Sequence, residues 1–331
     1  MKKICWLATG GTIASRPGDD GLAPGFTALD MLELMPELRE FGQIACRDIM
    51  ELDSTNLQPQ DWQKIAGWID MLYDEFDGFV ITHGTDTLNW TCCALTFMLQ
   101  NLAKPVAVIG SQLTIEEAGT DAGRNLKAAF ALASKDNIAG VYAVCGNQII
   151  EGIWAKKLYS EDLRSIQSVN APPIAVFDDE NISWQENLPR PSAAKPFAVD
   201  YHIESKVCQL KIMPGLSSQI LYALADLGYR GIVLEAYGAG GIPFGTDDTE
   251  NDITAAAAAL TERGITIVCT TQCLYNGVHM QRYEVGIKAC RAGIIPAGLL
   301  TSEAATVRLM TALGQKLNRT EITELFSAYQ A

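Results

Sequence analysis

The sequence predicts an α/β protein with a larger N-terminal domain, built on a mostly parallel sheet, and a smaller C-terminal α/β domain. Apolar strand candidates alternate with amphipathic helix candidates, a pattern typical of βαβ units. The alternation is interrupted at Asn187–Pro196, where three prolines and no periodicity predict a linker. We therefore place the N-terminal domain at residues 1–186, the linker at 187–204 and the C-terminal domain at 205–331.

Each predicted element follows from a run of residues with the hydrophobic period of a strand or a helix. The predicted N-terminal strands are Lys3–Ala8, Gly78–Thr82, Val106–Gly110, Gly140–Cys145 and Ile174–Phe177. The predicted N-terminal helices are Pro59–Tyr73, Leu88–Asn101 and Asp121–Ser134, the last with Asp121 as its N-cap. The predicted C-terminal strands are Val207–Met213, Gly231–Glu235 and Thr266–Thr270. The predicted C-terminal helices are Ser217–Leu227, Asp252–Arg263, Ser302–Gln315 and Thr320–Tyr329.

Composition excludes several classes of function. The 331 residues are 48% hydrophobic and carry a net charge of −14, which argues against nucleic acid and anionic membrane surfaces as partners and favours solubility. The first apolar run stops at Thr9, short of the ~7–15 residues of a signal peptide core. No apolar run approaches the ~18 residues of a membrane span. The nine scattered cysteines indicate reduced thiols and a cytoplasmic protein.

Two threonine-rich turns each follow a predicted strand, at Thr9–Ala14 and Thr82–Thr87. Glycine lets the backbone bend sharply and approach a ligand, and open α/β sheets bind ligands beyond the carboxyl ends of their strands. We therefore predict a small-molecule site with hydroxyl nucleophiles. Thr12 needs a base or a cation to act as a nucleophile. The backbone N–H groups around Gly11 and Thr12 are available to an oxyanion; the alternative role for Thr12 is a helix N-cap.

Other chemistry finds less support. The chain has three histidines and lacks a nucleophile elbow, so we expect His83 to brace its turn rather than to act in a Ser–His–Asp triad. Cys269 and Cys273 lack a second ligand pair, so no metal is expected. No Walker or Rossmann spacing occurs, so no cofactor is expected. Ser15–Gly25, with three glycines and two prolines, predicts a loop of little regular structure, either a lid or a passive surface loop.

The two threonine turns, in this order and at this separation, are specific. With them, the chain resembles the bacterial-type L-asparaginases, and best their cytoplasmic type I branch. The resemblance covers nearly the whole chain. It includes Asp53–Asn56, Gly110–Gln112, Lys157 with Ser168–Asn170, Tyr237–Gly240 and Thr270–Cys273.

The resemblance implies hydrolysis of L-asparagine to L-aspartate and ammonia through an acyl-enzyme on Thr12. Thr85, Asp86 and Lys157 would form a second catalytic group, in which Lys157 polarises Thr85 and assists proton transfer. Burial lowers a lysine pKa readily, which suits this role. Lys156 is adjacent, but the spacing to the later serine and asparagine favours Lys157, and neighbours in an extended segment point to opposite faces.

The resemblance also implies a substrate-binding set. Gly11 belongs to it through the first turn, Ser54 would bind the α-carboxylate of the substrate, and Asp86 its α-ammonium. Thr85 and Thr55 also belong to this set, and Thr55 stands where many members carry glutamine. Glu284 loosely matches an acidic residue that helps to bind the ammonium across subunits, because the family forms homodimers that pair into tetramers.

The chain departs from the family pattern at three positions. Leu22 stands where many members have a lid tyrosine, which leaves open what activates Thr12. Gly241 stands where some relatives have asparagine, and Thr114 where proline is common. Three other functions stay open: a broader glutaminase–asparaginase, a non-catalytic amino-acid sensor, and the amidase component of a tRNA-dependent amidotransferase. The amidotransferase component usually needs an extra N-terminal domain, for which Thr12 comes too early.

Overall fold

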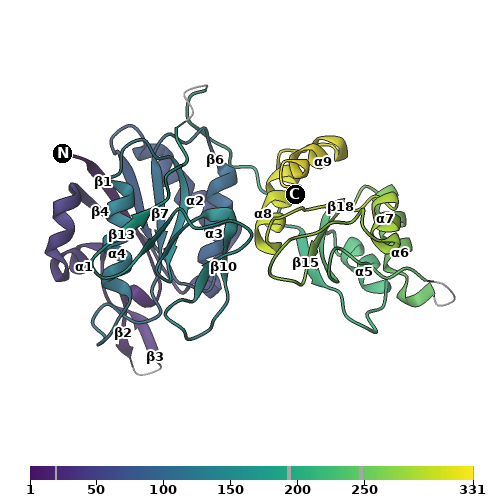
Figure 1. The fold of residues 1–331 in the computed structure, drawn as a ribbon, viewed down its shortest axis with the longest axis horizontal. Helices are drawn as coiled ribbons and strands as arrows, with labels where there is room; N and C mark the ends of the chain where they lie inside the picture. The colour runs from purple at the N-terminus through teal and green to yellow at the C-terminus, as the bar shows by residue number, and fades with distance from the viewer. Residues whose placement is uncertain (19–20, 192–194, 246–248, 331) are drawn as a thin grey trace. The chain divides into compact units, whose positions relative to one another are not determined.

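The computed structural model describes residues 1–18, 21–191, 195–245 and 249–330. The chain divides into two compact units, Met1–Tyr201 and His202–Ala331 (Figure 1). Both units pack helices against a sheet, so the predicted α/β class is confirmed. Residues 192–194 of the predicted linker lie outside the described residues. Ala198–Val199, in the same segment, form β14, which pairs with β6 (Leu99–Gln100).

The N-terminal unit contains an eight-stranded sheet in the order β13-β12-β9-β8-β7-β5-β1-β4. Its parallel strands are β1 (Lys3–Gly10), β4 (Gln43–Leu52), β5 (Gly78–Thr82), β7 (Pro105–Ile109) and β8 (Gly140–Cys145). The antiparallel extension is β9 (Gln148–Glu151), β12 (Ala175–Phe177) and β13 (Ile182–Trp184). β5 and β7 are buried along their whole length, as expected for parallel strands covered on both faces. The edge strand β4 escaped prediction because its exposed residues break the apolar run.

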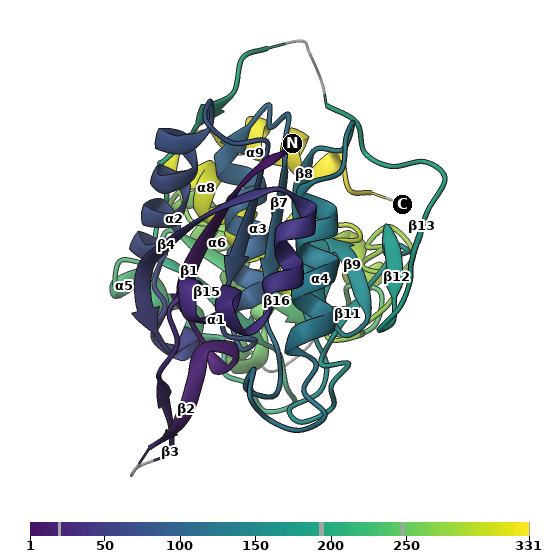
Figure 2. The ribbon, with the colours of Figure 1, turned by 90° about the vertical axis from the view of Figure 1, so that its left-hand side faces the viewer.

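Helices cover both faces of this sheet (Figures 1 and 2). One face carries α1 (Ala28–Leu34) and α4 (Ala122–Ala133), and the other carries α2 (Pro59–Leu72) and α3 (Leu88–Met98). The core under α4 includes Trp6, whose ring meets that of Phe130 edge-on at 5.2 Å. The helix predicted at Leu88–Asn101 ends at Met98, because Leu99 leaves the helical conformation and Asn101 has a φ of 56°.

The segment predicted as a loop at Ser15–Gly25 is a β-hairpin, so that prediction is wrong. β2 (Ser15–Gly18) pairs antiparallel with β3 (Gly21–Pro24), and Figure 2 shows the hairpin extending away from the sheet. Its described strand residues are mostly exposed, so no hydrophobic alternation marks them. At its base the Arg16 guanidinium lies 3.8 Å from the centre of the Phe26 ring. Residues 19–20 of the predicted loop lie outside the described residues.

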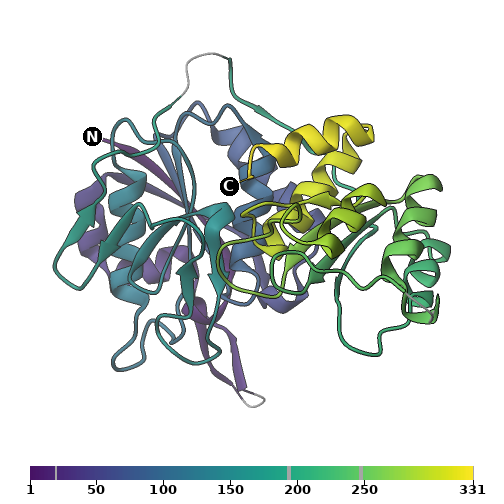
Figure 3. The same ribbon diagram turned by 45° about the vertical axis from the view of Figure 1, so that its right-hand side comes forward.

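The C-terminal unit has a four-stranded parallel sheet in sequential order. Its strands are β15 (Val207–Lys211), β16 (Gly231–Ala236), β17 (Thr266–Thr271) and β18 (Ile295–Pro296). Its helices are α5 (Gln219–Asp226), α6 (Ile253–Glu262), α7 (Glu284–Arg291), α8 (Ser302–Gly314) and α9 (Arg319–Ser327) (Figure 3). α5, α6 and α7 share one apolar core with the sheet. The two-residue β18 is too short to give a sequence signal.

Candidate active site

A small cavity lies where β1 and β5 end. The two strands are parallel neighbours, with Ala8 beside Thr82, so the turns that follow them are adjacent. The cavity measures about 90 Å³. It is lined by Gly11, Thr12, Ser15, Leu52, Asp53, Ser54, Gly84, Thr85 and Asp86. Five of the predicted site residues are therefore brought together: Gly11, Thr12, Ser54, Thr85 and Asp86.

Glycines make this meeting of two turns possible. Gly11 has a φ of 88°, and a Cβ there would come within 2.4 Å of the backbone nitrogen of Gly84. A Cβ at Gly84 would come within 2.5 Å of the Ser54 hydroxyl oxygen. Gly11, not Thr12, occupies the N-cap position of the 3-10 turn Thr12–Ala14. The N-cap alternative for Thr12 is therefore wrong, and Thr12 belongs to the cavity wall.

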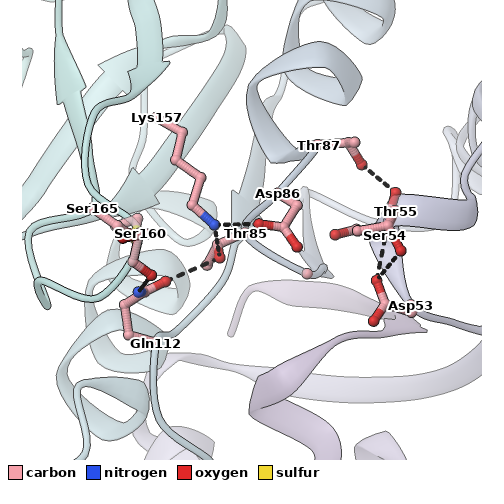
Figure 4. A network of polar contacts seen from close by, with 12 residues as sticks. Asp53, Ser54, Thr55, Thr85, Asp86, Thr87, Gln112, Lys157, Ser160 and Ser165 are labelled. Carbon is pink, nitrogen blue, oxygen red and sulfur yellow. Dashed lines mark hydrogen bonds and ion pairs between the residues drawn. The ribbon is translucent and has the colours of Figure 1, made fainter.

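A lysine reaches the second turn from another part of the sequence. Lys157 ends β10 (Ala155–Lys157), and its Nζ donates to Thr85 Oγ1 at 2.9 Å and pairs with the Asp86 carboxylate (Figure 4). β10 pairs antiparallel with β11 (Ile166–Ser168), which holds the segment extended. Alternate side chains of an extended strand face opposite sides, so Lys156 projects away from this contact. The choice of Lys157 over its neighbour agrees with this geometry.

Gln112 joins the same network and was absent from the predicted site. Thr85 Oγ1 donates to Gln112 Oε1 at 3.0 Å, and Gln112 Nε2 donates to the Ser160 carbonyl at 2.7 Å (Figure 4). The only sequence signal was the Gly110–Gln112 motif after a buried strand. Asp121 was predicted as a helix cap, and it does precede α4, but its carboxylate makes no capping bond. It accepts instead from the backbone N–H of Gln112 at 3.0 Å.

Asp53, Ser54 and Thr55 form the other side of the cavity. Asp53 caps a 3-10 turn, Ser54–Asn56, and Thr55 donates to its carboxylate from both the backbone N–H and the hydroxyl, at 2.8 Å each. Thr55 is exposed, and its hydroxyl is engaged with Asp53 (Figure 4). Ser54 is buried, and its carbonyl accepts from the Thr87 hydroxyl at 2.8 Å. Asp53 lines the cavity together with Ser15, Leu52 and Gly84, and the predicted site included none of these four.

His83 braces the second turn, as predicted. The Gly84 carbonyl can only accept, so His83 Nδ1 carries the proton and donates to it at 2.7 Å. Nε2 then accepts from the Thr91 hydroxyl at 2.9 Å, and Trp62 Nε1 donates to the same hydroxyl at 3.1 Å. Burial lowers the pKa of His83 to about 4. The ring is therefore neutral near pH 7 and fixed in one tautomer.

Glu284 and the positions that depart from the family are not among the residues named as lining this cavity. Glu284 begins α7 in the C-terminal unit, and its carboxylate lies 2.9 Å from Lys288 Nζ. Gly241 accepts from the backbone N–H of Tyr237 at 3.0 Å. Thr114 is buried in the loop after β7. Leu22 belongs to β3, but its side chain lies outside the described part of the structure.

Four further observations concern the cysteines, metal binding and the membrane. None of the nine cysteines forms a disulfide. Burial raises the pKa of the Cys145 thiol to about 11. Within the described ranges, no group of three histidine, cysteine or acidic side chains is placed to hold a metal ion. No helix in those ranges is long and apolar enough to cross a membrane.

Two family models match the chain. Residues 3–190 match "Asparaginase, N-terminal" and residues 206–326 match "Glutaminase/Asparaginase C-terminal domain". The chain is 41% identical over 324 residues to an L-asparaginase from Thermococcus kodakarensis, covering 98% of this chain and 96% of that protein. It is 32% identical over 336 residues to a component of the glutamyl-tRNA(Gln) amidotransferase from Pyrococcus abyssi, covering 98% of this chain and 75% of that protein.

Solved structures agree with these matches. The thermostable L-asparaginase from Thermococcus kodakarensis has a TM-score of 0.89 at 40% identity, with 98% of this chain and 96% of that chain covered. L-asparaginase I from Vibrio cholerae has a TM-score of 0.87 at 29% identity, with 100% and 99% covered. The resemblance carried by the sequence motifs is thereby confirmed over both units. The chain belongs to the asparaginase family and is an amidohydrolase.

Proposed function

We propose that the protein hydrolyses L-asparagine to L-aspartate and ammonia, with Thr12 as the nucleophile. One observation carries the proposal: Lys157 Nζ lies 2.9 Å from Thr85 Oγ1, and Thr85 lines the same cavity as Thr12. A hydroxyl beside a cation can take part in the proton transfers that acyl transfer through a threonine ester needs. The L-asparaginase from Thermococcus kodakarensis, 41% identical, supports asparagine as the substrate.

The reaction has two halves. Thr12 Oγ attacks the side-chain amide carbon, the C–N bond breaks, and the proton that Thr12 loses leaves with the nitrogen as ammonia. Water then attacks the ester carbon, the bond to Thr12 Oγ breaks, and a proton from water returns to Thr12. The backbone N–H groups around Gly11 and Thr12 would stabilise each tetrahedral oxyanion. Lys157 would polarise Thr85 and assist the proton transfers.

Two other residues that line the cavity, Ser54 and Asp86, would recognise the substrate. The Ser54 hydroxyl would donate to the α-carboxylate, and the Asp86 carboxylate would accept from the α-ammonium while it keeps its contact with Lys157. Glutamine carries one more methylene than asparagine, so selection between the two would depend on how closely the cavity wall fits the side chain. One methylene gives only ~1–3 kcal/mol of discrimination, so a broader glutaminase–asparaginase is the second candidate.

Ammonia release by the purified chain tests the function. L-Asparagine and L-glutamine are compared over a wide concentration range, with Thr12→Ala as the inactive reference. We expect release from asparagine, and a loss of at least about 1,000-fold in kcat for Thr12→Ala. Asparagine binding by calorimetry without ammonia release would identify a sensor. Release that needs a second protein would point instead to the role named for the Pyrococcus abyssi relative.

We further propose a cytoplasmic homo-oligomer, a dimer or a tetramer, in which Glu284 contributes to a neighbouring protomer's site. Support for the location comes from the absence of disulfides among the nine cysteines and from a neighbour described as a probable cytoplasmic L-asparaginase from Campylobacter jejuni, 25% identical with a TM-score of 0.84. A single monomeric species by light scattering at assay concentration would contradict the assembly. A Glu284→Gln variant with unchanged KM would contradict the role of Glu284.

A further inference from the structure

We propose that Gln112 is a positioning residue that fixes the direction of the Thr85 hydroxyl. In this arrangement the Thr85 hydroxyl proton points to Gln112, and a lone pair of Thr85 Oγ1 faces the cavity as a hydrogen-bond acceptor. The inference rests on the proposed function and deepens it, because it assigns a role to a residue behind the cavity wall. Gln112 is half-buried and does not line the cavity.

The argument starts from the bonding capacity of a hydroxyl. A threonine hydroxyl has one proton to donate and two lone pairs to accept with. A lysine ammonium can only donate, so the 2.9 Å contact from Lys157 Nζ occupies one lone pair of Thr85 Oγ1. The Thr85 proton goes to Gln112 Oε1 at 3.0 Å. One lone pair is left, and it is the group that Thr85 can present to a molecule in the cavity.

The orientation of the Gln112 amide is fixed by its other partner. Its nitrogen donates to the Ser160 carbonyl at 2.7 Å, and a carbonyl can only accept. A flipped amide would set two oxygens against each other at Ser160. The oxygen of Gln112 must therefore face Thr85, as Figure 4 shows.

A buried carboxylate holds the backbone of Gln112 in place. Asp121 is fully buried and accepts from the N–H of Gln112 at 3.0 and 3.2 Å and from that of Leu113 at 3.3 Å. Asn125 Nδ2 donates to Asp121 at 3.0 Å and to the Gly110 carbonyl at 2.9 Å. A buried network of this kind is rigid, because each broken bond would leave a polar group unsatisfied. Gln112 is thus presented to Thr85 from a fixed support.

The direction of the hydroxyl matters for the second half-reaction. The water that attacks the ester must turn a lone pair to carbon and a proton to an acceptor. The free lone pair of Thr85 Oγ1 is that hydrogen-bond acceptor, and the proton itself passes to Thr12 Oγ1 when the ester bond breaks. Without Gln112, the Thr85 hydroxyl can rotate and donate into the cavity. A water held in that way would turn a lone pair to Thr85 and not to the ester carbon. Loss of Gln112 should therefore slow turnover while substrate binding is preserved.

Two substitutions separate positioning from packing. Gln112→Met keeps the length of the side chain and removes the acceptor, and we expect kcat to fall by about 10- to 100-fold with kcat/KM within about threefold, because kcat/KM does not depend on the second half-reaction. Gln112→Glu keeps an oxygen facing Thr85 but sets its other oxygen against the Ser160 carbonyl, so it should lose some kcat yet at least about threefold less than Gln112→Met. Gln148→Met is the control, because it removes another partly buried amide, whose Nε2 lies 3.1 Å from Gln167 Oε1. Its kcat should stay within about twofold.

The kinetic test uses the full-length chain, with thermal unfolding to confirm that each variant folds. An acyl-enzyme burst in Gln112→Met, with slow steady turnover, would support the proposal. A kcat for Gln112→Met within twofold of the parent would overturn it. Equal losses in Gln112→Met and Gln112→Glu would also overturn it, since packing alone would then explain the effect.

A second readout does not depend on activity. A neutron structure of the deuterated protein locates the hydroxyl deuterium of Thr85. Deuterium directed at Gln112 Oε1 supports the proposal, and deuterium directed into the cavity overturns it. If the parent protein released no ammonia but showed deuterium on the Gln112 side, the proposed function would fail while the assignment of the hydroxyl direction stood.

Discussion

The two sides of the cavity are built in different ways. On the lysine side, formed by Thr85, Lys157 and Gln112, the bonds join residues 72 and 27 positions apart in the sequence. On the turn side, formed by Asp53, Ser54 and Thr55, the carboxylate of Asp53 organises a turn two residues away. Groups proposed to move protons are held by long-range contacts between elements. Of the groups proposed to recognise the substrate, Ser54 lies on a local turn that is largely complete by itself, whereas Asp86 pairs with Lys157 on the lysine side.

The lysine side should be the more sensitive of the two. Lys157→Met removes the cation beside Thr85, and we expect kcat to fall by at least about 1,000-fold, because proton transfer loses its partner. Lys156→Met is the matched control, since this neighbour projects to the opposite face of β10, and its kcat should stay within about threefold. Both are measured as steady-state ammonia release. Equal losses in the two variants would show that charge in this segment, not the contact with Thr85, is what matters.

The close backbone contact between Gly11 and Gly84 joins the two turns that line the cavity. Gly11→Ala would place a Cβ 2.4 Å from the Gly84 nitrogen at a φ of 88°. We expect the free energy of unfolding to fall by more than about 3 kcal/mol, because backbone atoms cannot move aside cheaply. Gly119→Ala is the control, with a φ of 79° but open space around it. It should lose only about 1–2 kcal/mol, measured by urea unfolding.

His83, next to Gly84, makes the free energy of unfolding depend on pH. Burial lowers its pKa in the folded protein to about 4, whereas the unfolded value is ~6.5. Between these values the unfolded chain binds the extra proton, so stability falls as the pH is lowered from about 6.5 to about 4, by about 3 kcal/mol in total. His83→Asn keeps a donor for the Gly84 carbonyl and cannot titrate. Its unfolding free energy should therefore decline less over this range, and parallel curves for the two proteins would contradict the assignment.

The turn side should respond least, and two neighbours there should respond differently. Ser54→Ala should raise KM by about tenfold, since one hydrogen bond to a charged group is lost. Thr55→Val should change KM by less than about twofold, because the Thr55 hydroxyl already donates to Asp53 at 2.8 Å. Steady-state kinetics with L-asparagine measures both. A larger effect at Thr55 would mean that its hydroxyl turns toward the substrate on binding.

The same contrast explains what could be predicted from the sequence. The two turns were predictable because glycine and threonine follow apolar runs, and parallel strands bring their carboxyl ends to one edge. Gln112 and Asp121 were not, because their roles depend on partners such as Thr85 and Leu113 whose proximity comes from the fold. Asp121 shows the limit clearly, since its position before a helix suggested a cap and its carboxylate bonds elsewhere.

The β2–β3 hairpin and the edge strand β4 were not predicted from the sequence, for a related reason. Sequence periodicity reports burial, and most described residues of β2 are exposed, while most residues of β4 are exposed or only partly buried. Glycines and prolines in Ser15–Gly25 indicated a loop, although antiparallel pairing between Ser15 and Pro24 forms there. Motifs at turns were thus more informative than propensity in the segments that border the cavity.

One feature of the sheet bears on how this protein could diverge. β4 ends the sheet, and the Asp53–Thr55 segment follows directly from it. Substitutions at this margin would leave the inner strands and the Lys157–Thr85–Gln112 contacts in place. Selection or design could therefore change substrate preference through substitutions at residues 53–55, while the residues proposed to act in catalysis stay the same.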